Sequence, residues 1–185
     1  MRRGLRDSLD RAYAEIPKEY WLADFAKWTV ASWVKCDACG MFYYEGSSAN
    51  HHKNTLQAST RLGFDNYAPS GGPGVNPSPG PDPAATTEWR HVAWVKNADT
   101  NDLTYYVNGE QVGTETFEAY TGPTPTIGIL GGFRSPVVSN YAEQNFKGTL
   151  SETVFFHGVA KDADAINKIK EGKDNGGWSP LVPSC

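Results

Sequence analysis

The stretch EWRHVAWVKNADTNDLTYYVNGEQVG, from Glu88 to Gly113, decides the fold class of this 185-residue chain. Two apolar, aromatic-rich runs, Trp89–Val95 and Leu103–Val107, flank the polar segment Asn97–Asp102. The pair Asn108-Gly109 follows and favours a type I′ turn, because both central residues of that turn need a positive φ. The stretch therefore predicts an antiparallel meander within a sheet.

Composition extends this prediction to the whole chain. Aromatic residues make up 12% of the sequence, glycine and proline are frequent, and long helical patterns are almost absent. This mixture is typical of an all-β sandwich or barrel, and the length suits one domain covering residues 1–185. Within that domain we expect a long surface loop rich in proline and glycine at residues 68–87 and a tail at residues 173–185.

Further segments have the patterns of strands, a turn of helix and a loop. One short helix is predicted over Lys161–Gly172, with Asp162 as N-cap and Ile166 and Ile169 on one face. Glu19–Phe25 suggests a short turn of helix, and Gly46–Asn54 a polar loop that holds His51 and His52. Strands are expected at Leu5–Pro17, Lys27–Lys35, Met41–Tyr44, Thr55–Phe64, Gln111–Glu118, Thr126–Leu130 and Phe146–His157.

Charge and hydropathy exclude two classes of partner. The net charge is −4 and lysine and arginine form no basic stripe, so we expect no binding to nucleic acid. No apolar run approaches the ~20 residues that span a bilayer, so we expect no membrane insertion. We expect no signal peptide, because Met1-Arg2-Arg3 leads into polar residues and not into an apolar run. We expect an extracellular or cell-surface location as part of a larger protein, and an intracellular location stays open.

The three cysteines leave several interpretations open. Cys36 and Cys39 have the C-x-x-C spacing, and Cys185 is the last residue. We favour a local disulfide between Cys36 and Cys39, which suits an oxidising compartment. Two free thiols are an alternative. A zinc site is a third, but it would need ligands from His51, His52 or Cys185.

Five runs together resemble laminin G-like domains of the concanavalin A-like jelly-roll class. They are WTVASWVK, EWRHVAWVKN, LTYYVNGEQVG, PTIGILGG, and FKGTLSETVFFHGVA followed by DADAINKI. Asn108 and Ser151 stand where aspartate is usual in the family, and SLDRAYAEIP resembles its entry strand. The order holds from about Leu5 to Ile169. The resemblance implies an all-β, two-sheet antiparallel jelly-roll sandwich, in which one sheet is concave, followed by one short C-terminal helix.

Aromatic and amide residues are the candidates for ligand binding, because sugar rings stack on aromatic rings and amides and guanidinium groups bind hydroxyls. We expect Trp28, Trp89, Tyr105 and Phe155 or Phe156 to be core. Alternation along the strands predicts that another group of aromatic residues lines the concave face: Trp33, Trp94 and Tyr106. Loop residues expected at the rim are Asn66, Tyr67, Arg134, Asn140 and Tyr141.

Calcium is the one cofactor that the resemblance suggests, since many relatives hold it with loop oxygens. The candidate ligands are Asp65, Asp99, Asn101 and Asp102. Calcium needs 6–8 oxygens, and neither Asp65 with its neighbour nor the cluster from Asp99 to Asp102 supplies that number alone. Ordinary turn chemistry is the favoured explanation of Asp99 to Asp102. Otherwise we expect no cofactor.

The sequence lacks the signature of a glycosidase of this architecture. Glycoside hydrolysis needs two carboxylates across the scissile bond, at even spacing if they share a strand face. Glu115 and Glu118 are odd-spaced, and Glu152, at a closing-strand position of the family, is expected to hydrogen-bond locally. We therefore predict a non-catalytic module that binds a glycan or glycoprotein. The alternative is a protein–protein adhesion or assembly module; a glycoside hydrolase or polysaccharide lyase is the less favoured third.

Overall fold

Two five-stranded antiparallel sheets form the protein. The computed structural model describes residues 14–38, 40–48, 51–58, 62–67, 86–117, 124–132 and 146–174. One sheet has the order β1 (Ala14–Glu15), β9 (Ile127–Leu130), β3 (Met41–Ser48), β4 (His51–Ala58) and β5 (Leu62–Tyr67). The other has the order β10 (Lys147–His157), β2 (Lys27–Ala38), β6 (Thr86–Asn97), β7 (Asp102–Val107) and β8 (Glu110–Thr116). This is the predicted all-β jelly-roll sandwich.

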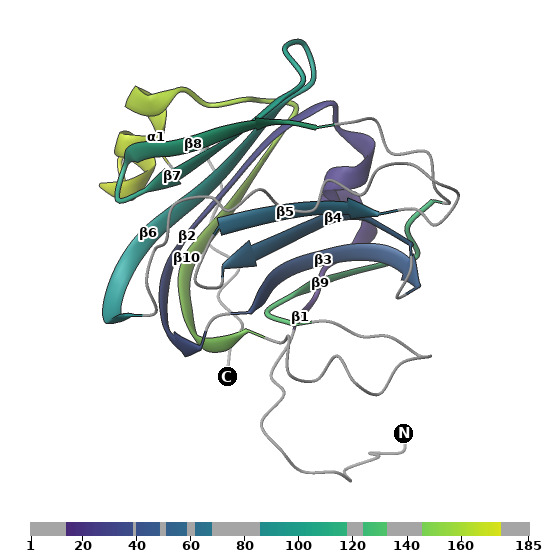
Figure 1. Cartoon of the computed structure of the whole chain (residues 1–185), viewed down its shortest axis with the longest axis horizontal. Coiled ribbons are helices and arrows are strands. Elements are labelled where there is room, and N and C mark those ends of the chain that lie inside the picture. The colour runs from purple at the N-terminus through teal and green to yellow at the C-terminus, as the bar shows by residue number, and fades with distance from the viewer. Residues whose placement is uncertain are drawn as a thin grey trace, which may run out of the picture.

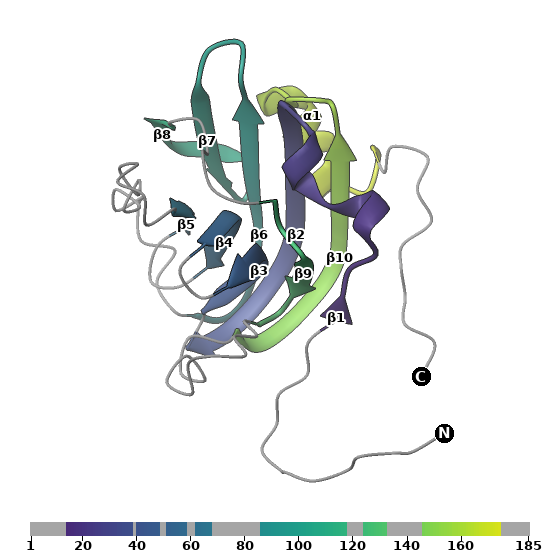
Figure 2. The same ribbon diagram turned by 90° about the vertical axis from the view of Figure 1, so that its right-hand side faces the viewer.

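The second sheet bends around the first, so its concave side holds the core (Figure 1). Helix α1 (Ala163–Lys170) lies against its outer, convex side, as the rotated view in Figure 2 also shows. Two short 3₁₀ helices, η1 (Lys18–Tyr20) and η2 (Leu22–Asp24), follow β1 and confirm the predicted helical turn. Among the described residues, no helix has both the length and the apolar character needed to cross a membrane.

Strand β2 is buried on both faces. Trp28, Val30 and Val34 point between the sheets, where they join a core that includes Phe42, Leu56, Leu62, Phe64, Val92, Leu103 and Tyr105. Ala31 points the other way and packs beneath α1, in a second cluster with Ala93, Val95, Tyr106, Phe156, Ile166 and Ile169. Alternate residues of β2 therefore belong to two separate hydrophobic clusters, one on each face of the sheet.

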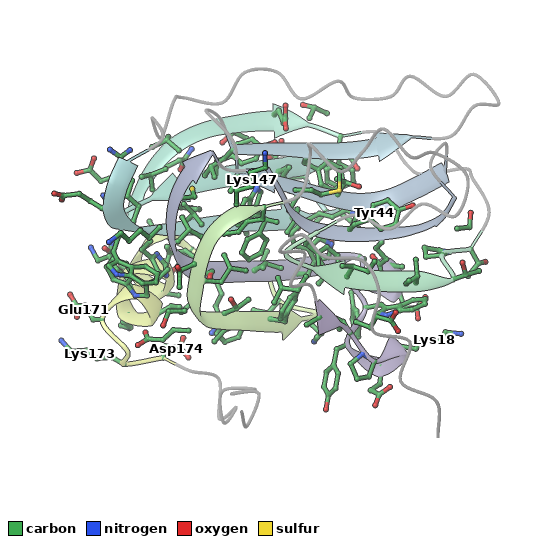
Figure 3. All side chains as sticks on the ribbon, turned by 90° about the horizontal axis from the view of Figure 1, so that it is seen from below. Lys18, Tyr44, Lys147, Glu171, Lys173 and Asp174 are labelled. Carbon is green, nitrogen blue, oxygen red and sulfur yellow. The ribbon has the colours of Figure 1, made fainter. Side chains whose placement is uncertain are left out.

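Helix α1 begins and ends as its sequence predicts. The Asp162 side chain accepts a hydrogen bond of 2.9 Å from the backbone N of Ala165, which caps the N-terminus. Gly172 follows the helix with a φ of 70°, a conformation that glycine adopts without strain. Figure 3 shows Glu171, Lys173 and Asp174 at this end of the helix, where Lys173 and Glu171 form an exposed ion pair of 2.7 Å.

The predicted turn between β7 and β8 is confirmed, and α1 holds it in place. Asn108 and Gly109 have φ values of 52° and 87°, as a type I′ turn requires. Lys170 Nζ donates to the carbonyl of Asn108 at 2.9 Å, and Asn167 Nδ2 donates to that of Gly109 at 3.3 Å. The helix therefore fixes the hairpin end to the convex face of the sheet.

Two predicted segment boundaries are wrong. The strand expected over Thr55–Phe64 is a hairpin, because β4 ends at Ala58 and β5 begins at Leu62. The polar loop expected at Gly46–Asn54 is mostly strand, since β3 and β4 extend into it. Asn54 Nδ2 donates to Glu45 Oε2 at 2.6 Å, and both residues are fully buried. Polar residues thus pair across the strands here instead of marking a loop.

Two tryptophans differ in burial from the prediction: one expected at the surface is buried, and one expected in the core is partly exposed. Trp94 is fully buried between the sheets and stacks on Phe42 with ring centroids 4.9 Å apart, because its pairing with Val30 puts it on the core face. Trp89, expected in the core, is 43% exposed. The pairing of β6 with β2 becomes irregular beyond Arg90, which releases Trp89 from the regular sheet.

Most of the predicted Pro/Gly-rich loop and tail lie outside the described residues. Of the predicted loop at residues 68–87, the structure describes only Thr86 and Thr87, which begin β6. Of the predicted tail at residues 173–185, it describes only Lys173 and Asp174.

Replacing Trp94 with alanine should destabilise the protein by about 3–5 kcal/mol, because it opens a cavity in the inter-sheet core. The matched change Trp89→Ala should lower the free energy of unfolding by less, about 1 kcal/mol, because Trp89 is 43% exposed and lies outside the inter-sheet core. Urea unfolding of both variants measures the difference. Equal destabilisation would contradict the assigned positions.

Candidate functional site

An aromatic and polar patch lies on the convex face of the β10–β8 sheet, next to α1. Trp33 on β2 pairs with His91 on β6 and with Ser151 on β10. We call these three residues, together with Trp89 and Glu152, the Trp33 patch. Three adjacent strands therefore supply the patch, and strand pairing fixes their relative positions.

The Trp33 ring lies at the border of the apolar cluster under α1. Its strand neighbour on the same face, Ala31, is fully buried in that cluster, while Trp33 is only half-buried. The ring meets His91 edge-on, with centroids 5.5 Å apart and planes at 67°. An aromatic ring held in this way combines a fixed orientation with access to solvent.

His91 packs against the Trp33 ring and is itself hydrogen-bonded to the β7–β8 turn. It is 2% exposed, its backbone N donates to Asn108 Oδ1 at 3.1 Å, and its carbonyl accepts from Asn108 N at 2.7 Å. Its Nδ1 has no hydrogen-bond partner in the described part of the chain. Burial, and secondly the positive charge of Lys170, lower the pKa of His91 to about 4. The imidazole is therefore neutral at pH 7.

Polar groups surround Trp33 on the solvent side. Ser151 and Glu152 are exposed on β10, and Lys35, two residues along β2 from Trp33, is exposed as well. Trp89, two residues before His91 on β6, is exposed where the regular pairing with β2 ends. The patch thus offers an aromatic surface together with hydroxyl, carboxylate and ammonium groups, a combination that suits a polyhydroxylated ligand.

The binding residues predicted from sequence do not gather at one place. Trp33 is accessible, but on the convex face and not on a concave one. Tyr106 shares the convex face and is buried under α1, so the prediction that it lines the concave face is wrong. Trp94 lies on the concave side but is enclosed in the core there, so it offers no surface to a ligand. Asn66 and Tyr67 belong to β5, but their side chains lie outside the described set, as do Arg134, Asn140 and Tyr141 entirely.

The candidate calcium ligands of the β6–β7 turn are engaged in turn structure. Asp99 forms an ion pair with Lys27, and its backbone N donates to Asn97 Oδ1 at 3.1 Å. Asn101 has a φ of 55°, which asparagine tolerates in turns, and Asp102 is in β7. Asp65 is in β5. Within the described ranges, no group of three or more His, Cys, Asp or Glu side chains could hold a metal ion.

Cys36 is disulfide-bonded and buried. The alternatives of a free thiol or a zinc ligand are therefore wrong for this residue. Its predicted partner Cys39, and also Cys185, lie outside the described residues.

Four members of the patch escaped the sequence prediction, and one of them, His91, is explained from its sequence as an ordinary strand residue. Trp89 belongs to a regular apolar pattern that predicts a core position, and only the loss of regular pairing exposes it. Ser151 and Glu152 lie within the alternating strand, where no residue type marks a bulge. Ser151 stands where the family usually has aspartate, which was the one available signal. Glu152 makes no side-chain hydrogen bond or ion pair to a described residue, contrary to the local bond expected for it.

Comparison with known proteins places the fold. A family model described as the concanavalin A-like lectin/glucanases superfamily matches residues 10–166. No curated protein matches the chain. The CBM40 of the Ruminococcus gnavus IT-sialidase, solved with alpha2,3 sialyllactose, aligns at 16% identity and a TM-score of 0.64, over 79% of this chain and 83% of that one.

Two other solved structures have the same fold. The heptameric SAP-like pentraxin from Limulus polyphemus aligns at 16% identity and a TM-score of 0.62, over 79% of this chain and 70% of that one. The NanB sialidase from Streptococcus pneumoniae aligns at 18% identity and a TM-score of 0.64. In the sialidase, 86% of this chain matches only 26% of the other, so the chain is similar to a part of that protein.

Acidification should destabilise the protein through His91. Its folded-state pKa of about 4 lies below the usual 6.5, so protonation favours unfolding. The stabilising contribution is complete above about pH 6.5 and is lost as the pH falls towards 4, with about 2 kcal/mol lost by pH 5. Urea unfolding at pH 7.5 and pH 5 should show a smaller loss for His91→Gln than for the wild type. The same loss in both proteins would contradict the assignment.

Proposed function

Because the chain belongs to the concanavalin A-like lectin/glucanase superfamily, we propose that it is a non-catalytic carbohydrate-binding module whose ligand contacts the Trp33 patch. Similarity to a carbohydrate-binding module with a bound sialylated sugar supports the ligand class. At 16% identity that likeness concerns the fold, so the position of the site must come from this chain's own residues.

The observation that carries the proposal is the half-buried Trp33 ring, held edge-on against buried His91 and open to solvent. The C–H groups of a sugar ring pack on an aromatic surface, while its hydroxyls need donors and acceptors at the edge of that surface. Ser151, Glu152 and Lys35 provide both kinds of group. Other large aromatic side chains, such as Trp28 and Trp94, are enclosed in the core.

Rigidity also favours the patch as a binding site. Trp33 lies on β2, which is hydrogen-bonded on both sides to β6 and β10. His91 is tied through Asn108 to the turn that Lys170 of α1 holds. A site built on paired strands loses little conformational freedom when a ligand binds, which favours affinity.

A protein-adhesion or assembly function is the second candidate, and exposed Trp89 favours it, since tryptophan is enriched in protein interfaces. An extracellular or cell-surface location forms part of the proposal in either case. The disulfide at Cys36 supports it, because disulfides persist in oxidising compartments.

Replacing Trp33 with alanine should weaken glycan binding by at least about tenfold, which corresponds to about 1.4 kcal/mol. The experiment is a glycan array followed by titration calorimetry of the best ligand, with and without a calcium chelator. The chelator arm shows whether calcium takes part in binding.

The matched control is Val159→Ala, which removes another exposed apolar side chain next to the N-terminal end of α1 and should bind as the wild type does. Failure of the wild type to bind any glycan would overturn the proposal. A stable homo-oligomer or a co-purified protein with Trp89 at the contact would favour the adhesion module instead. Release of sugar from the ligand would show an enzyme.

A further inference from the structure

The backbone of Glu152 is unusual for its residue type. Three described residues other than glycine have a positive φ: Asn101, Asn108 and Glu152. The two asparagines lie in turns, where that residue type is at home. Glu152 has a φ of 52° in the middle of β10, a conformation that disfavours a long side chain with a Cβ. Its conformation therefore calls for a cause.

A bulge in β10 begins directly after Ser151, the residue that pairs with Trp33. Ser151 pairs with Trp33 and Val154 pairs with Ala31, so three steps along β10 match two along β2. Glu152 and Thr153 therefore stand opposite the single residue Ser32, and Glu152 directly follows the partner of Trp33. Its Cα lies about 3.8 Å from that of Ser151, which in turn faces Trp33 across the strand pair.

The glutamate side chain does not hold the bulge together. Ser32 does so: its hydroxyl donates to the carbonyl of Ser151 at 3.1 Å and lies 2.9 Å from the hydroxyl of Thr153. Glu152 is exposed and, among the described residues, forms no side-chain hydrogen bond or ion pair. Glycine would satisfy the backbone conformation with less strain, so the carboxylate is kept at a cost that its contacts within the described chain do not explain.

We infer that Glu152 contacts the ligand of the Trp33 patch and directs that site towards neutral saccharides; the inference rests on the proposed function. An ionised carboxylate only accepts hydrogen bonds, and a sugar with neighbouring hydroxyls donates two of them to it. A carboxylated sugar would meet repulsion at the same place. Lys35, also exposed, adds a donor on the other side of Trp33, so the site matches a ligand that both donates and accepts.

Two variants separate this role from a structural one. Glu152→Gln should weaken binding of a neutral hexasaccharide about tenfold, while binding of an acidic one does not fall. Glu152→Gly should weaken the same binding at least as much and raise the melting temperature by about 2–4 °C, because it relieves the backbone strain. The probes are gluco-, galacto- and manno-hexasaccharides against oligogalacturonate of equal length, measured by calorimetry.

Glu19→Gln is the control, because Glu19 is also exposed and lies on η1, whose Lys18 is seen in Figure 3 at the opposite end of the molecule from the end of α1. It should leave binding and melting temperature unchanged. If Trp33→Ala abolishes binding but Glu152→Gln and Glu152→Gly bind normally, this inference fails and the proposed function stands. Binding of oligogalacturonate alone would likewise overturn the inference and leave the proposed function in place, whereas binding of no glycan at all would overturn both.

Discussion

The fold depends on the burial of β2 on both of its faces. One set of alternate side chains, led by Trp28 and Val30, closes the core between the sheets, and the other, at Ala31, seats α1 on the convex side. A strand in this position has no solvent-facing side along most of its length, so its residues must be apolar or have hydrogen-bonded polar groups. The sequence WTVASWVK meets that demand, because its buried polar residues Thr29 and Ser32 both form hydrogen bonds through their hydroxyls. β6 and β10 are placed by pairing with β2, and β7 and β8 follow outward from β6.

The Trp33 patch exists because α1 covers only part of its sheet. Lys161, just before the helix, donates its backbone N–H to Thr29 Oγ1 on β2 at 3.0 Å, and Lys170 at the other end of the helix donates to the β7–β8 turn. The cover ends between Ala31 and Trp33, and the aromatic pattern of the strand continues beyond it. Trp33 thus continues the apolar pattern of its strand but lies beyond the edge of the buried cluster. Its ring is therefore held in a fixed orientation and is still accessible to solvent.

Local sequence patterns predicted turns and helix ends correctly, but they did not predict which face of a sheet a side chain occupies. The Asn108-Gly109 turn and the caps of α1 follow from the conformational preferences of two or three adjacent residues, so the sequence alone predicts them. The face that Trp94 occupies depends on which residue of β2 it pairs with, and nothing in the strand itself specifies that register. The patch was found only through Trp33, and was expected on the concave side. Trp89 and Glu152 depend on irregular pairing, which an alternating pattern conceals.

The bulge in β10 has an evident structural use, and that use does not extend to the carboxylate. β10 is an edge strand of its sheet, and an extra residue that bends the edge hinders pairing with another chain. The backbone bulge supplies this protection whichever residue stands at its centre, and Ser32 secures it from the neighbouring strand. A glycine there would protect the edge equally and with less strain. Protection of the edge therefore explains the bulge but not the choice of glutamate, which the proposed contact with a ligand at Trp33 would explain.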